Sequence, residues 1–230
     1  LNLGCHAPMI RRQQSGSRLF ADPEGLAAVL RRLRDSWPGL LSVKVRLGSR
    51  TSDWRQVFRD RLRLFEDYGV DLITVHLRFF EDRFKRPARH DLLPWVISLT
   101  SLPVIANGDI VGPSTVAERR DLFAGAAGLM IGRMAAAQPW IFAAWAGRVS
   151  PDYREVWERM VAAVVEDFPA GQAVARIKVL TRFFAHNFRF GHSLAVAVQN
   201  APDLAAIRGA AERFFADDPE PVAALTPTCL

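Results

Sequence analysis

The chain has 230 residues, of which 50% are hydrophobic and 23% are charged, and its formal net charge is +6 at pH 7. This balance excludes a disordered polypeptide, and the length is enough for one large domain with a sizeable core. No apolar run has the length of about 20 residues that a bilayer-spanning helix needs. Two cysteines at opposite ends, Cys5 and Cys229, form neither a disulfide framework nor a metal cluster, so we expect no metal and a reducing cytoplasm.

Strand-like and helix-like segments alternate over the first two thirds of the chain. The predicted strands are Leu1–Gly4, Leu40–Leu47, Asp71–His76, Pro103–Ala106 and Ala127–Ile131. The predicted helices run from the Asp22-Pro23 cap to a stop near Trp37, then over Trp54–Tyr68, through Trp95 and Leu99, over Pro113–Phe123 and over Pro139–Trp145. Repeated βα units with crossover connections predict a parallel sheet, which is either doubly wound or closed into a (β/α)8 barrel.

The position of the polar residues favours the barrel. They lie at or just after the carboxyl ends of successive predicted strands, where a TIM barrel builds its active site. These residues are Cys5, Lys44, His76, Asn107 and the pair Gly132-Arg133. Five strands do not close such a barrel, so we expect about three further βα units before Leu1.

Beyond about Pro151 the strand signal stops and three helix-periodic segments follow. They are Asp152–Phe168, Gln172–Phe188 and Asp203–Phe215, with Gly191–Pro202 as a separating loop. We therefore predict a partial barrel over 1–148, a helical bundle over 149–216 and a tail over 217–230.

Five short motifs appear in a fixed order, and a sixth follows in the helical part. They are Asn2-Leu3-Gly4-Cys5, Lys44-Val45-Arg46-Leu47-Gly48, Val75-His76-Leu77-Arg78, Ala106-Asn107-Gly108-Asp109, Gly132-Arg133 and, later, Ala175-Arg176-Ile177-Lys178. Together they resemble the tRNA-dihydrouridine synthase family. The chain departs from that pattern at His6, where the family has proline, and at Leu77, where it has a small residue.

The resemblance implies reduction of the C5–C6 double bond of tRNA uridines, with FMN as cofactor and NADPH as reductant. This reaction needs a hydride at C6 and a proton at C5, and a thiol can release a proton near neutral pH. By resemblance, reduced flavin supplies the hydride and Cys5 the proton. Asn2 is expected to bind the substrate or to fix the cysteine loop.

The resemblance also implies a set of cofactor contacts. Lys44 lies in an apolar strand, where an ammonium group is costly to bury unless it reaches the polar mouth or an anion. It is expected at the flavin ring, with His76 also contacting flavin and Arg46 serving substrate or phosphate. The loops Asn107-Gly108-Asp109 and Gly132-Arg133 could each be a plain turn. Taken together, they are expected to bind the FMN phosphate through backbone N–H groups and the Arg133 guanidinium.

Arginine supplies almost all of the positive charge, and the chain has only three lysines. This bias has two possible explanations, a GC-rich genome that favours arginine codons or a nucleic-acid partner whose phosphates arginine binds, and composition alone does not decide between them. The loop from Arg78 to Arg89 mixes cations with phenylalanines, and Arg176 and Lys178 fall in a predicted helix with Arg182. We expect the loop to contact tRNA backbone and to stack on exposed bases, and the helix to present these cations near one face as a phosphate-binding stripe. We expect no membrane partner, and a monomer.

Two other functions remain open at this point. One is an FMN-dependent barrel oxidoreductase of a small molecule, of the dihydroorotate-dehydrogenase type, which needs no basic helical appendage. The other is an inactive RNA-binding remnant.

Overall fold

A computed structural model describes residues 1–82, 84–147 and 151–225. Contacts divide the chain into two compact units. The first comprises Leu1–Ile110 with Val116–Ile131, and the second comprises Val111–Thr115 with the chain from Gly132 onward. Cys229 lies outside the described residues, and Cys5 is a free thiol.

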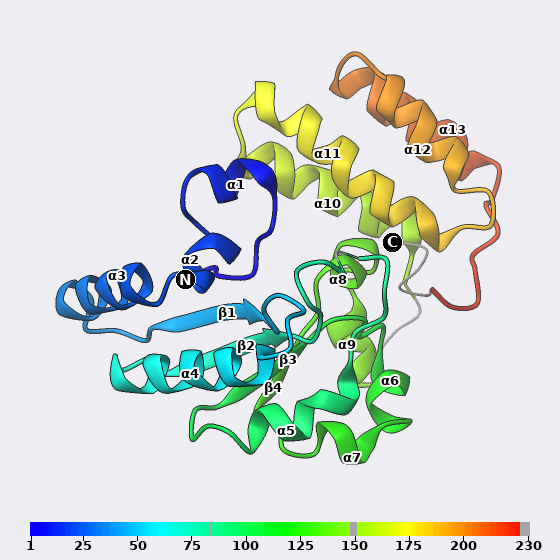
Figure 1. The fold of residues 1–230 in the computed structure, drawn as a ribbon. Helices are drawn as coiled ribbons and strands as arrows, with labels where there is room; N and C mark the ends of the chain where they lie inside the picture. Colours follow the sequence, from blue (N-terminus) through cyan, green and yellow to red (C-terminus); the bar gives the residue numbers. More distant parts are fainter. Residues whose placement is uncertain (83, 148–150, 226–230) are drawn as a thin grey trace. The chain divides into compact units, whose positions relative to one another are not determined.

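The first unit is built on a parallel sheet, as predicted. Its strands are β1 (Ser42–Arg46), β2 (Leu72–His76), β3 (Val104–Asn107) and β4 (Gly128–Met130), and they lie side by side in chain order (Figure 1). This order, with helices between the strands, is that of successive units of a (β/α)8 barrel.

The predicted first strand is reduced to one parallel bridge. Asn2 pairs with Lys44, the Leu3 N–H donates to the Lys44 carbonyl at 2.8 Å, and the Lys44 N–H donates to the Leu1 carbonyl at 2.9 Å. The segment Leu1–Gly4 thus pairs with β1 only at this bridge and is not a strand of the sheet, so this part of the prediction was wrong.

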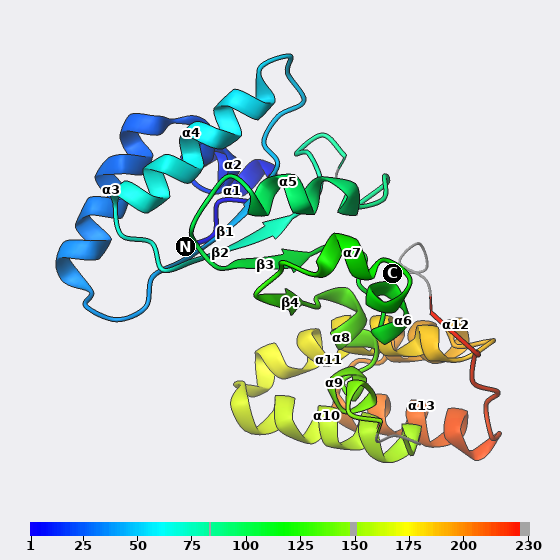
Figure 2. The ribbon, with the colours of Figure 1, turned by 90° about the horizontal axis from the view of Figure 1, so that it is seen from below.

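Apolar residues on the strands and helices explain the packing of this unit. The β2 strand is buried along most of its length, as expected for a parallel strand with neighbours on both sides. The connecting helices α4 (Trp54–Asp67) and α5 (Leu93–Ile97) lie along one face of the sheet, and Figure 2 shows the same arrangement from below. Phe58 of α4 packs against Trp95 of α5, and the centres of the two rings are 5.9 Å apart.

Capping confirms the predicted start of α3 (Pro23–Ser36). The Asp22 carboxylate accepts the Gly25 N–H at 3.0 Å, and proline occupies the first turn. Leu26 and Leu30, four residues apart, form the buried side of this helix.

Several short helices were not predicted. They are α1 (Pro8–Arg12), α2 (Ser17–Ala21), η1 (His90–Leu92) and α8 (Arg133–Ala137), which precedes the expected α9 (Ile141–Trp145). The single helix predicted over Pro113–Phe123 is instead two, α6 (Pro113–Ala117) and α7 (Arg120–Phe123). Helices of three to five residues are too short to show a helical period in the sequence.

The second unit is helical, and each of the three predicted helical segments is confirmed, but the prediction of a loop between the second and third was wrong. The structure has α10 (Tyr153–Asp167), α11 (Ala170–Phe184) with η2 (Ala185–Asn187), α12 (His192–Asn200) and α13 (Leu204–Ala216). The missed helix, α12, lies in the predicted loop Gly191–Pro202. Its apolar signal comes mainly from Leu194 and Val198, and tertiary burial of that pair stabilises it.

Side-chain hydrogen bonds support the core of the second unit. The Trp157 indole N–H donates to Thr181 Oγ1 at 3.1 Å, both residues being buried. Asn187 Nδ2 donates to the carbonyls of Ala137 and Phe184, which joins α8 to the end of α11. Part of the predicted tail is also paired, since the Val222 N–H donates to the Asn187 carbonyl. None of the described helices has the length and apolar character to cross a bilayer.

Candidate active site

The strand register brings three predicted site residues, Arg46, His76 and Asn107, to one edge of the sheet together with Met130. Arg46 pairs with His76, His76 with Asn107, and Asn107 with Met130, and each is the last residue of its strand. The carboxyl ends of parallel strands share an edge, so these residues form one row. Asn107 Nδ2 also donates to the Met130 carbonyl at 2.7 Å, which holds the ends of β3 and β4 together.

The Asn2 side chain is engaged in the turn that leads to the cysteine. Its Oδ1 accepts the Gly4 N–H at 3.1 Å. Of the two roles expected for Asn2, this contact supports fixing the cysteine loop.

Cys5 begins a loop that closes on itself. The Ser17 N–H donates to the Cys5 carbonyl at 2.8 Å, and the Ser17 hydroxyl lies 2.9 Å from His6 Nδ1. Gly16 has φ +61°, and a Cβ there would lie 2.4 Å from the Cys5 oxygen. The His6 ring stacks on Phe80 at 5.4 Å, so the histidine that stands in place of the family's proline anchors the loop.

Arg46 lies directly beside this loop. Its Cγ is 3.5 Å from the position a Cβ on Gly4 would take, so the two residues are in van der Waals contact range. Nη1 donates to the Phe79 carbonyl at 3.4 Å, and the guanidinium lies 5.3 Å from the centre of the Phe84 ring. A buried cation is thereby placed at the base of the Cys5 loop.

Two neighbouring cations give this edge its electrostatic character. Burial lowers the pKa of Lys44, and the positive charge of Arg46 lowers it further. Burial also lowers the pKa of Arg46, as does Arg78, whereas Cys5 and Asp82 act in the opposite direction. No ion pair joins the Lys44 ammonium to any part of the chain that the structure describes. An anionic group bound here would relieve the repulsion between the two cations.

Arg78 lies in a buried network rather than on a surface. Nη2 contacts both carboxylate oxygens of Asp109 at 2.5 and 2.6 Å, and these side chains are only 3% and 10% exposed. Nη1 lies 2.9 Å from His76 Nε2, and Nε donates to the Arg86 carbonyl. Arg78 therefore holds His76 and Asp109 in place, a role that the sequence did not suggest.

The turn after β3 requires glycine. Gly108 has φ +114°, and a Cβ there would lie 2.7 Å from the His76 ring and 3.0 Å from the Ala88 side chain. Asp109 follows with φ +49°, and its carboxylate accepts the Ala88 N–H at 2.7 Å. The Asn-Gly-Asp motif is thus more than a plain surface turn, because its side chains and backbone pack into the row of strand ends.

Gly132 and Arg133 follow β4 and belong to the second unit. Gly132 immediately precedes α8, and a Cβ on it would meet no heavy atom within 4 Å. The predicted cradle residues 107–109 and 132–133 therefore occupy successive strand-end loops, as the motif order implied.

In the basic loop from Arg78 to Arg89, most of the phenylalanines that were expected to stack on RNA bases are buried. Phe79 and Phe80 are buried, whereas Phe84 is 57% exposed and lies 6.1 Å from the His76 ring. The buried Asp82 organises the loop by accepting the Phe79 N–H at 2.9 Å. Arg83 lies outside the described residues.

The predicted basic stripe of α11 divides over two faces, since residues two apart on a helix differ by about 200°. Arg176 stacks over Phe168 at 3.9 Å. Lys178 and Arg182 instead line a groove of about 790 Å³ together with His186, Arg189 and His192.

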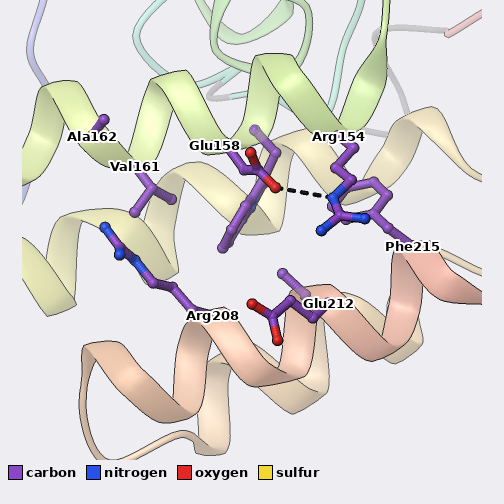
Figure 3. A pocket seen from close by; sticks show the side chains of 9 residues that line it. Arg154, Glu158, Val161, Ala162, Arg208, Glu212 and Phe215 are labelled. Carbon is purple, nitrogen blue, oxygen red and sulfur yellow. Dashed lines mark hydrogen bonds and ion pairs between the residues drawn. The ribbon is translucent and has the colours of Figure 1, made fainter.

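A second groove, of about 380 Å³, is lined by residues of α10 and α13 (Figure 3). Arg154 pairs with Glu158 at 3.0 Å, and Arg208 and Glu212 also line the groove. Its charges alternate in sign, unlike those of the Lys178 groove.

Gly16, Ser17 and Asp82 shape the site and were not predicted. Their contacts join residues distant in sequence, and a Gly-Ser pair or a single aspartate in a polar loop carries no distinctive signal. Among the described residues, no three His, Cys, Asp or Glu side chains are grouped so that they could hold a metal ion.

Comparison with known proteins agrees with the geometry. The family model described as dihydrouridine synthase matches residues 1–200. The tRNA-dihydrouridine synthase B of Proteus vulgaris is 34% identical over 142 residues, which is 62% of this chain and 43% of that protein. The protein of the same name from Escherichia coli strain K12 is 34% identical over 145 residues, with the same coverage, and that from Yersinia pestis is 33% identical over 145 residues.

The matched region thus spans less than half the length of these curated relatives. The family match, by contrast, extends over most of the present chain and includes the strand-end row and the cysteine loop. The chain belongs to the dihydrouridine synthase family.

Proposed function

We propose that this protein reduces uridines of tRNA to 5,6-dihydrouridine, with FMN as cofactor and NADPH as reductant. The observation that carries the proposal is the convergence of the Cys5 loop, the paired cations Lys44 and Arg46, and the Asn107–Asp109 turn at one sheet edge. The names of the relatives support tRNA uridine as the substrate.

The residues at the strand ends fit a flavin phosphate and a flavin ring whose edge becomes negatively charged on reduction. Lys44 and Arg46 repel one another and are partly buried, so an anionic ring edge satisfies both. We assign Lys44 and His76 to the ring, and Asn107, Gly108, Asp109, Gly132 and Arg133 to the phosphate. Bound FMN, reduced by NADPH, supplies the hydride to C6 of the uracil.

Cys5 donates the proton to C5. The thiol S–H bond breaks as the new C5–H bond forms, which leaves a thiolate that takes up a proton from water to restore the enzyme. The buried side chain of Arg46 lies beside the Cys5 loop. Asn2, Gly16 and Ser17 hold the loop in one conformation, so that the proton is delivered from a fixed position.

The Lys178 groove is the proposed site for tRNA backbone. Its lining includes Lys178, Arg182 and two histidines, while Arg189 is paired with Glu220 at 3.0 Å. Phosphate contacts of this kind position RNA without reading its sequence. We assign Arg176 to a separate tRNA contact on the other side of α11, and Arg78 to support of the cofactor turn.

These assignments imply a catalytic part over 1–148 and a tRNA-binding part over 149–216. We further propose that the protein is monomeric and acts in the cytoplasm, where its tRNA substrate is found. Light scattering of the purified protein tests the first of these statements, and fractionation of cells tests the second.

The decisive experiment measures dihydrouridine in tRNA from a strain that lacks the gene. We expect the modification to disappear from at least one position, to return with the wild-type gene, and to stay absent with Cys5→Ala. Purified Cys5→Ala should bind FMN like the wild type, because the thiol is not one of the proposed cofactor contacts.

Three results separate the proposed function from its rivals. Unchanged dihydrouridine in the deletion strain contradicts it and favours a small-molecule substrate or an inactive remnant. Flavin-dependent NADPH oxidation that does not respond to tRNA favours the small-molecule enzyme. Full restoration by Cys5→Ala contradicts the assignment of the proton donor.

A further inference from the structure

His90 is a buried titratable residue that the proposed reaction does not use. It lies in η1, is 3% exposed, and packs edge-on against the Phe123 ring at 5.0 Å. Its Nε2 lies 2.8 Å from the Gly108 carbonyl oxygen, and its Nδ1 lies 2.9 Å from Arg119 Nη1. Both ring nitrogens are therefore engaged, one of them by the backbone of the predicted phosphate turn.

These partners define the protonation state of the ring. A carbonyl only accepts and a guanidinium only donates, so Nε2 carries the proton and Nδ1 accepts from Arg119. Burial lowers the pKa of His90, and the positive charges of Arg119 and Arg78 lower it further. The Gly108 carbonyl and Asp109 act in the opposite direction but do not cancel this effect. His90 is a neutral, oriented donor directed at one backbone oxygen.

That oxygen controls the geometry of the turn. The peptide between Gly108 and Asp109 is planar, so fixing its carbonyl also fixes the direction of the Asp109 N–H, which points away from His90. The same turn is held on its other side by Arg78, through the Asp109 carboxylate. The left-handed conformations of both residues leave few alternative orientations, and the His90 bond selects one.

We propose that His90 is a positioning residue that orients the Gly108–Asp109 peptide for the phosphate of FMN, with Arg119 holding its tautomer. The inference rests on the proposed function. It predicts a phosphate-specific effect, because the contact concerns the turn and leaves the ring contacts of Lys44 and His76 in place.

The test compares the affinities of the whole protein for FMN and for riboflavin, which lacks the phosphate, by flavin fluorescence titration. His90→Phe keeps an aromatic ring beside Phe123 but removes the donor. We expect it to raise the Kd for FMN about tenfold, the effect of one lost buried hydrogen bond. The Kd for riboflavin should change less than about twofold. His90→Gln, which retains an N–H donor, should recover most of the FMN affinity.

Two further variants guard against a purely structural explanation. Phe123→Leu removes the ring contact but leaves both hydrogen bonds of His90, and should leave the ratio of the two Kd values unchanged. Arg119→Met, at an exposed position, releases Nδ1 and should raise the FMN Kd selectively but less than His90→Phe does. If His90→Phe does not fold, Arg119→Met still allows the Kd values for FMN and riboflavin to be compared.

Equal weakening of FMN and riboflavin, or no weakening of either by His90→Phe and Arg119→Met, overturns the inference while the proposed function stands. A wild-type protein that binds riboflavin and FMN equally well also overturns it. If the wild type binds neither flavin, the proposed function fails and the inference with it.

Discussion

The strand-end row of the first unit and the grooves of the second unit use charge in opposite ways. In the row, Arg46, His76 and Arg78 are buried and held by specific partners. In the second unit, Arg176, Arg182 and Arg189 are exposed on helix surfaces. Buried, fixed charges stabilise one arrangement of atoms, whereas exposed ones attract any phosphate backbone. This difference agrees with the proposed assignment of the chemistry to the first unit and of tRNA binding to the second.

The largest expected effect comes from breaking the buried ion pair. Arg78→Met removes the guanidinium that forms the ion pair with the buried Asp109 carboxylate, so we expect the free energy of unfolding to fall by about 3–5 kcal/mol in urea titrations. The control is Arg154→Met, which removes an ion pair whose side chains are each 55% exposed. In Arg154→Met the free energy of unfolding should fall by less than about 1 kcal/mol. Similar costs for the two variants would remove the contrast between the units.

Glycine substitutions should also differ between the units. Gly108→Ala forces a Cβ against the His76 ring at a positive φ, and should destabilise the protein by about 1–3 kcal/mol. Gly171→Ala, in the first turn of α11, meets no atom within 4 Å and should be neutral or stabilising by up to about 1 kcal/mol. Thermal and urea unfolding measure both. A harmless Gly108→Ala would show that the turn is not constrained.

The helical unit is tested by the salt dependence of tRNA binding. Arg182→Ala should weaken binding by about three- to tenfold for all tRNAs and reduce the slope of log K against log salt by about 0.7–0.9. The mixed-charge groove supplies the control, because Arg154→Ala should leave both quantities unchanged. Equal losses in the two variants would indicate a general effect of net charge rather than a phosphate site.

The smallest expected effect is a pH dependence of stability. Burial lowers the pKa of His90, so the stability due to its neutral form is complete above about pH 6.5, and it is lost as pH falls toward the folded-state pKa. His90→Gln should therefore flatten the decline of unfolding free energy between pH 7 and pH 5. Hydrogen bonds from Thr100 and Ser101 lower the pKa of Glu66, so the stability that this carboxylate contributes is present throughout this range and is lost only as pH falls below about 4.5.

His186 in the second unit serves as the comparison. Burial lowers the pKa of His186, and the charge of Arg182 lowers it further, so protonation of His186 affects stability in the same pH range. His90 is the more buried of the two and makes two hydrogen bonds, so His186→Gln should flatten the profile less. The reverse order would place the pH-sensitive core in the helical unit.

Parts of the fold followed from local patterns. Alternating βα segments predicted the parallel sheet, and the Asp22-Pro23 cap predicted the start of α3, because periodicity and capping depend on neighbouring residues. The short helices and α12 were missed, since their stability depends on contacts outside the segment. The stripe of Arg176 and Lys178 was wrong as a single face because the helix turns by about 200° between them.

The sequence by itself determined the family, the succession of βα units and the residues that end each strand. These features are written in the order and type of side chains, and a parallel sheet brings strand ends to one edge without further information. Tertiary structure alone decided which charges are buried and what they contact. Arg78 binding Asp109, Gly16 closing on Cys5, and His90 holding the Gly108 carbonyl all join segments that are separate in sequence. Such contacts depend on side-chain distances and burial, which no local pattern encodes.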